Sequence, residues 1–242
     1  MRSSHENRDR GVQRFRSNAG GYLAYDDKVS GKRPGVLVWP QVCGPGVHSR
    51  TKAEKLAALG YVAFAGDYYG NSRELDRLDD AIKLAHSLFD DTTALRRRAM
   101  AALNQLASLP RVDSARLASI GFCIGGNFSL ELAREGAPLR GVVSFHGGLH
   151  TERPAKKGGV KARILACTGG DDLLVPPEQV NAFQGEMTAA GVDWQVITYG
   201  AVKHNFTDPD TARLGNPALE YHQLADERSW NAMAAFCKEI FA

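Results

Sequence analysis

The sequence lacks an apolar run long enough to cross a bilayer. Polar residues interrupt every hydrophobic segment well before the roughly 20 residues that a membrane helix needs. It also lacks a strong charge of either sign, because 30 Lys and Arg against 27 Asp and Glu leave a net charge of only +3. The charges are scattered, which argues against nucleic-acid binding. We therefore expect neither a membrane nor a nucleic acid as a partner.

Cysteine is scarce and forms no recognisable pattern. The four cysteines (Cys43, Cys123, Cys167 and Cys237) show neither C-x-x-C spacing nor the spacing of a zinc site. We therefore expect no metal and no cofactor. The amino-terminal residues have no apolar signal-peptide core, and a free thiol persists in a reducing compartment. These features predict a cytoplasmic protein.

The remaining composition is that of an ordinary globular protein. Hydrophobic residues make up 43% and charged residues 24% of 242 residues, which suits one large α/β domain. We expect residues 1–18 to be a polar leader or a first strand, and residues 19–242 to form a single domain. The sequence leaves the oligomeric state open.

Segments with strand patterns alternate with segments of helical spacing along the chain. The pattern predicts helices from about Ser49, a plausible N-cap, to Leu59, and then over 79–89, 92–109, 127–134, 177–190 and 224–241. It predicts strands over 21–25, 36–39, 61–65, 112–119, 139–145, 163–168 and 193–199. Such alternation is typical of a mostly parallel central sheet with helices on both faces.

The stretch from Gly121 to Gly126 organises the chain. It places Cys123 between a predicted strand and a predicted helix, with Gly121 and Gly125 two residues to either side. This is the pattern of a nucleophile elbow, G-x-S-x-G, with cysteine in place of serine. A buried structural cysteine in a strand-to-helix turn is the alternative interpretation.

An acid and a histidine follow in the order that such an elbow requires. Asp172 comes after the predicted strand at 163–168, and His204 comes after the strand at 193–199. Because the carboxyl ends of parallel strands meet at one edge, we expect both side chains near Cys123. Asp171 competes with Asp172 for the acid position, and the other aspartate would be a capping or solvated residue.

The chemistry of these residue types suggests a division of roles. Cys123 would attack an activated carbonyl, His204 would act as base and then as acid, and Asp172 would fix the imidazole tautomer. The tetrahedral oxyanion needs two donors. We expect these to be the backbone N–H groups of Ile124 and of Val42, in the loop after the strand at 36–39.

The chain resembles the dienelactone hydrolase family of α/β-hydrolases over roughly residues 20–242. The specific match is the segment Gly121-Phe122-Cys123-Ile124-Gly125-Gly126; the segments at 169–176 and 199–206 also match. The resemblance implies an α/β-hydrolase fold and a cysteine-dependent hydrolase of small esters, lactones or thioesters, without a cofactor. Asp172 is the acid that the family pattern selects.

The sequence departs from the family pattern at two places. Gln41 stands where the family usually has a glutamate that contacts the resting thiol. The acidic stretch from Thr207 to Asp210 stands where the dienelactone-cleaving enzyme has an arginine for the substrate carboxylate. Both departures leave the triad intact, and they argue against a carboxylated dienelactone as the substrate.

Four residues at the same edge are candidates for the substrate pocket: Trp39, Gln41, Tyr68 and His146. Core packing explains Trp39 and Tyr68 equally well. The second functional class left open is a non-catalytic α/β-hydrolase fold that binds a small ligand. The triad order favours the hydrolase, because a binding protein has no need of all three residues.

Overall fold

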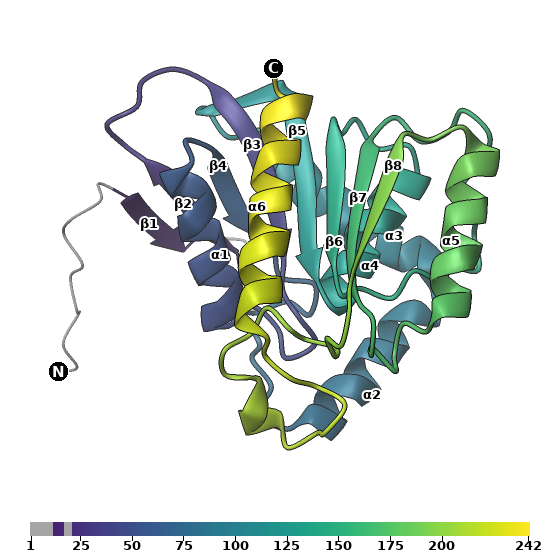
Figure 1. The fold of residues 1–242 in the computed structure, drawn as a ribbon. Coiled ribbons are helices and arrows are strands. Elements are labelled where there is room, and N and C mark those ends of the chain that lie inside the picture. Colours follow the sequence, from purple (N-terminus) through teal and green to yellow (C-terminus); the bar gives the residue numbers. More distant parts are fainter. Residues whose placement is uncertain (1–11, 17–20) are drawn as a thin grey trace, which may run out of the picture.

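The computed structural model describes residues 12–16 and 21–242 (Figure 1). The leader expected at 1–18 therefore falls mostly outside the described residues. Within it, β1 (Val12–Arg16) pairs antiparallel with β2 (Tyr22–Asp26). The domain boundary at residue 19 stays a prediction.

The described strands form one eight-stranded sheet in the order β1-β2-β4-β3-β5-β6-β7-β8. The pairs from β4 through β3 to β8 are all parallel, while β1 and β2 run antiparallel at one edge. The expectation of a mostly parallel sheet is confirmed. The remaining strands are β3 (Arg33–Trp39), β4 (Val62–Ala65), β5 (Val112–Phe122), β6 (Gly141–Phe145), β7 (Arg163–Gly169) and β8 (Trp194–Tyr199).

Helices cover both faces of this sheet (Figure 1). One face carries α1 (Val47–Ala58) and α6 (Gln223–Ile240), whose apolar side chains share a core with alternate residues of the central strands. The other face carries α3 (Thr92–Ala107), α4 (Ile124–Arg134) and α5 (Pro177–Ala190), which enclose a second core. Burial on both faces explains why the central strands are continuous apolar runs.

Two short elements lie beyond the sheet, α2 (Leu78–Phe89) and the 3₁₀ turn η1 (Thr211–Leu214), and both appear at the lower end of Figure 1. Among the described helices, none is long and apolar enough to span a membrane. The layers leave one edge of the sheet for the loops that carry the candidate site.

The start of one helix differs from the sequence prediction. The first helix begins at Val47, and its N-cap is Gly46 rather than Ser49. The Ser49 hydroxyl instead donates to the Gly46 carbonyl oxygen at 3.2 Å, inside the first turn. The elbow helix begins at Ile124, the residue expected to supply an N–H at its start.

Candidate active site

Cys123 sits on a strained turn between β5 and α4. Its backbone has φ 53° and ψ −124°, a combination that costs a non-glycine residue about 1–3 kcal/mol. A Cβ on Gly121 would lie 1.9 Å from the carbonyl oxygen of Gly125. One on Gly125 would lie 2.4 Å from the carbonyl oxygen of Pro40. Only glycine fits either position, as the elbow pattern predicts.

The loops after β7 and β8 bring an acid and a histidine together. His204 Nδ1 and Asp172 Oδ2 are 2.8 Å apart in a buried hydrogen bond. The other oxygen of Asp172 accepts the N–H groups of Leu174 and Val175. Asp171 is exposed, so Asp172 is the aspartate that meets His204. The two loops approach closely, since a Cβ on Gly169 would lie 2.2 Å from the carbonyl oxygen of Val202.

His204 also contacts Cys123, and the two groups perturb each other. Burial alone would raise the pKa of the Cys123 thiol, but the charge and hydrogen bond of His204 hold it below its ordinary value. Burial disfavours the His204 cation, yet Cys123 and Asp172 raise the pKa of His204 to about 10. Both shifts favour a thiolate beside an imidazolium. Nε2 is the ring nitrogen left for the sulfur, because Nδ1 binds Asp172 and Nε2 has no nitrogen or oxygen partner among the described residues.

Two backbone N–H groups complete the surroundings of the sulfur. Those of Ile124 and Val42 hydrogen-bond to Cys123 and favour its thiolate. Ile124 is the first residue of α4, where the unpaired N–H groups and the helix dipole attract negative charge. Val42 lies in the loop after β3. These are the two groups expected to hold an oxyanion.

The four residues expected to line a substrate pocket are almost entirely buried: Trp39 is 1%, Gln41 4%, Tyr68 2% and His146 0% exposed. Trp39 packs against the rings of Phe128 and Tyr68. The Tyr68 hydroxyl donates to the backbone carbonyl of Gln41, whose side chain reaches Asp208. These contacts give supporting roles within the fold, and contact of the four residues with a substrate stays a prediction, since the equally buried Asp172 and His204 are 4% and 3% exposed.

His146 supports the backbone of the elbow. Its Nδ1 accepts the N–H of Cys123 at 3.1 Å, and this N–H is shared with the carbonyl oxygen of Phe145. Its Nε2 lies 2.8 Å from the hydroxyl of Thr207, which in turn neighbours Nε2 of His48. Burial, and then the nearby charge of His204, hold the pKa of His146 well below its ordinary value. It is a neutral ring with its proton on Nε2.

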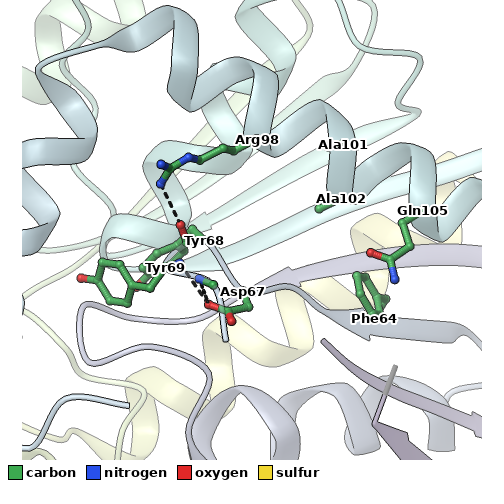
Figure 2. Close-up of a pocket in the computed structure, with 9 residues that line it drawn as sticks. Phe64, Asp67, Tyr68, Tyr69, Arg98, Ala101, Ala102 and Gln105 are labelled. Atoms are coloured by element: carbon green, nitrogen blue, oxygen red, sulfur yellow. Dashed lines mark hydrogen bonds between the residues drawn. The ribbon is translucent and has the colours of Figure 1, made fainter. Parts of the chain in front are cut away.

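Two hollows of the surface border the loops after β3 and β4. One of about 140 Å³ beside the loop after β3 is largely acidic, with Glu74, Asp76, Asp208 and Asp210 facing Arg213. A larger one of about 400 Å³, shown in Figure 2, lies between the Tyr68–Tyr69 loop and α3. It does not include Cys123, Asp172 or His204. Cys123 itself is partly exposed.

Sequence reasoning missed several residues of this centre. In the sequence, Thr207 and Asp208 stand out only as departures from a pattern, and nothing predicts a role for His48. Their partners are distant in the chain: Thr207 lies 159 positions after His48. The one available signal was the closeness of Thr207 and Asp208 to His204.

A parallel sheet, an elbow cysteine and an Asp172–His204 pair at one edge define an α/β-hydrolase. The model of the dienelactone hydrolase family matches residues 19–241, and the chain belongs to this family. Membership supports a hydrolase of esters or lactones.

The similarity to individual relatives supports membership of this family. A dienelactone hydrolase-like promiscuous phosphotriesterase from metagenomic libraries is 40% identical, with a TM-score of 0.87 over 92% of both chains. A protein named m3DLH is 42% identical, with a TM-score of 0.90 over 96% of this chain and 98% of that one. A putative carboxymethylenebutenolidase of Yersinia pestis is 25% identical over 226 residues, covering 88% of this chain and 80% of the relative.

Proposed function

We propose that the protein hydrolyses small carboxylic esters and lactones through an acyl-enzyme on Cys123, with His204 and Asp172 completing a triad. The observation that carries the proposal is the arrangement at the sulfur. His204, held by Asp172, hydrogen-bonds to it, and so do the N–H groups of Ile124 and Val42. The similarity to a putative carboxymethylenebutenolidase, an enzyme named for a lactone, supports the same substrate class.

The first half-reaction follows from this geometry. The Cys123 thiolate attacks the carbonyl carbon, the S–C bond forms, and the carbonyl electrons move onto oxygen. The N–H groups of Val42 and Ile124 stabilise the resulting oxyanion. When the tetrahedral intermediate collapses, His204 gives its proton to the leaving alkoxide oxygen, and an alcohol departs or a lactone ring opens. The product is a thioester on Cys123.

The second half-reaction restores the thiolate. His204, now neutral, removes a proton from water, and the hydroxide attacks the thioester carbonyl. The C–S bond breaks and releases a carboxylic acid. The 2.8 Å bond to Asp172 keeps the proton of His204 on Nδ1 in this step, so that Nε2 is free to act as base. The mechanism requires no cofactor. Because all four cysteines are free thiols, we also propose a reducing compartment such as the cytoplasm.

Hydrolysis of p-nitrophenyl acetate tests the proposal. The wild type should release p-nitrophenol in repeated turnovers, and Cys123→Ala should reduce the rate to background. Quenched reactions of His204→Ala should retain one acetyl group on Cys123, seen by mass spectrometry, because deacylation lacks its base. A wild type that binds the ester without turnover would instead favour a non-catalytic ligand-binding protein.

A second candidate activity is the hydrolysis of phosphotriesters. A relative 40% identical over nearly the whole chain is described as a promiscuous phosphotriesterase. The thiolate could attack phosphorus as it attacks carbon, with the same N–H groups on the phosphoryl oxygen. Release of p-nitrophenol from paraoxon that continues past one equivalent and is lost in Cys123→Ala would support it. A single equivalent would mean that the phosphorylated thiol is a dead end.

A further inference from the structure

The carbonyl of Gln41 and the N–H of Val42 belong to one peptide group. Such a group is planar and trans, so its C=O and N–H point in opposite directions. The N–H of Val42 faces the sulfur of Cys123. The carbonyl of Gln41 must therefore point away from the sulfur, into the protein. Whatever holds this carbonyl also aims the N–H.

Two donors hold that carbonyl. The N–H of Gly44 binds it at 2.9 Å within the turn that follows β3, and the Tyr68 hydroxyl binds it from the loop after β4. The turn bond is internal to the loop and moves with it. The Tyr68 bond is the one that ties this peptide to a different part of the fold.

The Tyr68 ring is itself fixed. It stacks on Phe128 of α4 at a centroid distance of 4.9 Å, and it packs against Trp39 at the end of β3. On the other side its backbone carbonyl accepts a hydrogen bond from Arg98 of α3 (Figure 2). Burial, and then the neighbouring Tyr69, raise the pKa of Tyr68 well above its ordinary value. The hydroxyl therefore keeps its proton and acts as a donor.

We propose that Tyr68 is a positioning residue for the oxyanion hole: its hydroxyl orients and polarises the Gln41–Val42 peptide so that the Val42 N–H is aimed at the reacting oxygen. A hydrogen bond to the carbonyl of an amide makes its N–H a stronger donor, because linked hydrogen bonds reinforce one another. In this role Tyr68 acts through the peptide and not by its own contact with the substrate. This inference rests on the proposed function of Cys123 and Val42.

The neighbouring tyrosine provides a matched control. The Tyr69 hydroxyl donates to the carbonyl oxygen of Val42 at 2.8 Å, and the carbonyl oxygen of Ala81 is a second acceptor at 3.3 Å for the same proton. The Val42 carbonyl belongs to the next peptide, whose N–H is that of Cys43. Tyr69→Phe therefore removes the same chemical group from the same loop, including its hydrogen bond with the Tyr68 side chain, but leaves the bond from Tyr68 to the Gln41 carbonyl in place.

The experiment compares the steady-state kinetics of wild type, Tyr68→Phe and Tyr69→Phe with p-nitrophenyl acetate. Deleting an oxyanion donor costs about 10²–10³-fold in kcat, and a donor that is present but poorly aimed should cost less, about 5- to 20-fold. We expect this loss in Tyr68→Phe with KM changed by less than about twofold, and kcat of Tyr69→Phe within about twofold of wild type.

A second measurement distinguishes positioning of the oxyanion hole from a merely structural role of Tyr68. A trifluoromethyl ketone adds the Cys123 thiolate and forms an oxyanion in the same hole, whereas the carboxylate product binds without one. In Tyr68→Phe, affinity for the ketone should fall by the same factor as kcat/KM, and affinity for the product should not change. Equal losses in the two tyrosine variants, or a loss confined to KM, would overturn the proposal.

The outcomes separate this inference from the proposed function. If Cys123→Ala keeps wild-type activity, the proposed function itself fails. If Cys123→Ala is inactive while Tyr68→Phe behaves like Tyr69→Phe, only the role of Tyr68 fails. Folding is checked by thermal melting, and Gly44 still satisfies the Gln41 carbonyl in Tyr68→Phe.

Should Tyr68→Phe not fold, 3-fluorotyrosine inserted at position 68 or 69 keeps the ring and strengthens the hydroxyl as a donor. A rise in kcat at 68 and none at 69 supports the proposal. The same change at both positions contradicts it.

Discussion

Gln41 Nε2 donates a 2.6 Å hydrogen bond to Oδ2 of Asp208, which lies 167 residues later in the chain. Both side chains are buried. The bond joins the loop that carries the Val42 N–H to the segment that follows His204. The two departures from the family pattern, the missing glutamate and the acidic stretch beyond the histidine, are therefore two halves of one contact.

This contact predicts that Gln41→Glu is destabilising by itself. The substitution places two carboxylates at hydrogen-bonding distance in a buried site, and losing the bond should cost about 1–3 kcal/mol of unfolding free energy. The double variant Gln41→Glu with Asp208→Asn reverses donor and acceptor and should recover most of that loss. Urea unfolding of the wild type, both single variants and the double variant measures it. A double variant no more stable than Gln41→Glu would mean that the contact contributes little.

The same four proteins test how the charge of residue 41 affects the reactivity of the Cys123 thiol. A negative charge at position 41 would disfavour the Cys123 thiolate, so the folded double variant should react with iodoacetamide at pH 7 more slowly than Asp208→Asn does. The wild type should react faster than free cysteine, since His204 lowers the pKa of the thiol. Equal alkylation rates for the double variant and Asp208→Asn would show that the side chain of residue 41 does not act on the sulfur.

The perturbed pKa values predict a broad pH profile for kcat/KM. As pH falls through the lowered pKa of Cys123, the thiolate gains a proton and activity is lost. As pH rises through about 10, the raised pKa of His204, the imidazolium loses the proton that it would give to the leaving group. Activity should therefore persist well above pH 8. These limits belong to the coupled pair rather than to either residue alone.

Replacing Asp172 should move the alkaline limit of that profile. Asp172→Asn removes a hydrogen bond and a charge that raise the pKa of His204, so the limit should shift to lower pH. The variant should also lose about 10²–10⁴-fold in kcat, because an asparagine no longer fixes the histidine tautomer. A full pH–rate profile of both enzymes checks the shift. An alkaline limit that does not move would assign it to another group.

The contact between His146 and Thr207 predicts a coupled loss of stability and reactivity. Thr207→Val keeps the shape but removes the acceptor of the His146 Nε2 proton at 2.8 Å, leaving a buried donor that costs about 1–3 kcal/mol. His146→Asn retains an acceptor for the Cys123 N–H and should alkylate faster than His146→Phe, which does not. Phe183→Leu, in the core beneath α5, is the control for stability loss alone. If that control slows alkylation equally, the effect is one of general destabilisation.

Charge around the site predicts substrate preference. The hollow beside the loop after β3 holds four carboxylate residues and one arginine, Arg213. A carboxylated lactone should therefore have no strong kcat/KM advantage over a neutral ester of similar size, since the absent clamp would contribute about 1.5–3 kcal/mol. A tenfold or larger advantage for the anionic lactone, abolished in Arg213→Ala, would show that this arginine binds the carboxylate.

The sequence was sufficient for the features that depend on local pattern. Apolar strands alternating with helices predicted the sheet, and Gly121 and Gly125 marked the elbow because their spacing has a steric cause. Ser49 was misleading as a helix start, because its hydroxyl bonds back to Gly46 within the first turn. Local propensity could not reveal that Gly46 already caps the helix.

The supporting contacts could not be predicted in this way. The bond from Tyr68 to Gln41 and that from His146 to Thr207 each join two loops, and no periodicity links their members. Both depend on how far each loop extends past its strand. A residue type such as histidine or tyrosine at a strand end is compatible with a pocket wall, a core position or a hydrogen-bonded support.

The collisions that require Gly121 and Gly125 involve main-chain atoms only. The position of residue 123 is thus fixed by the path of the backbone, whichever side chain it carries. Exchanging sulfur for oxygen at this point alters one atom and leaves the turn, the neighbouring N–H groups and the histidine where they are. The scaffold and its nucleophile are separable, so a lineage could trade a thiol for a hydroxyl in a single step and retune only the acidity of the attacking group.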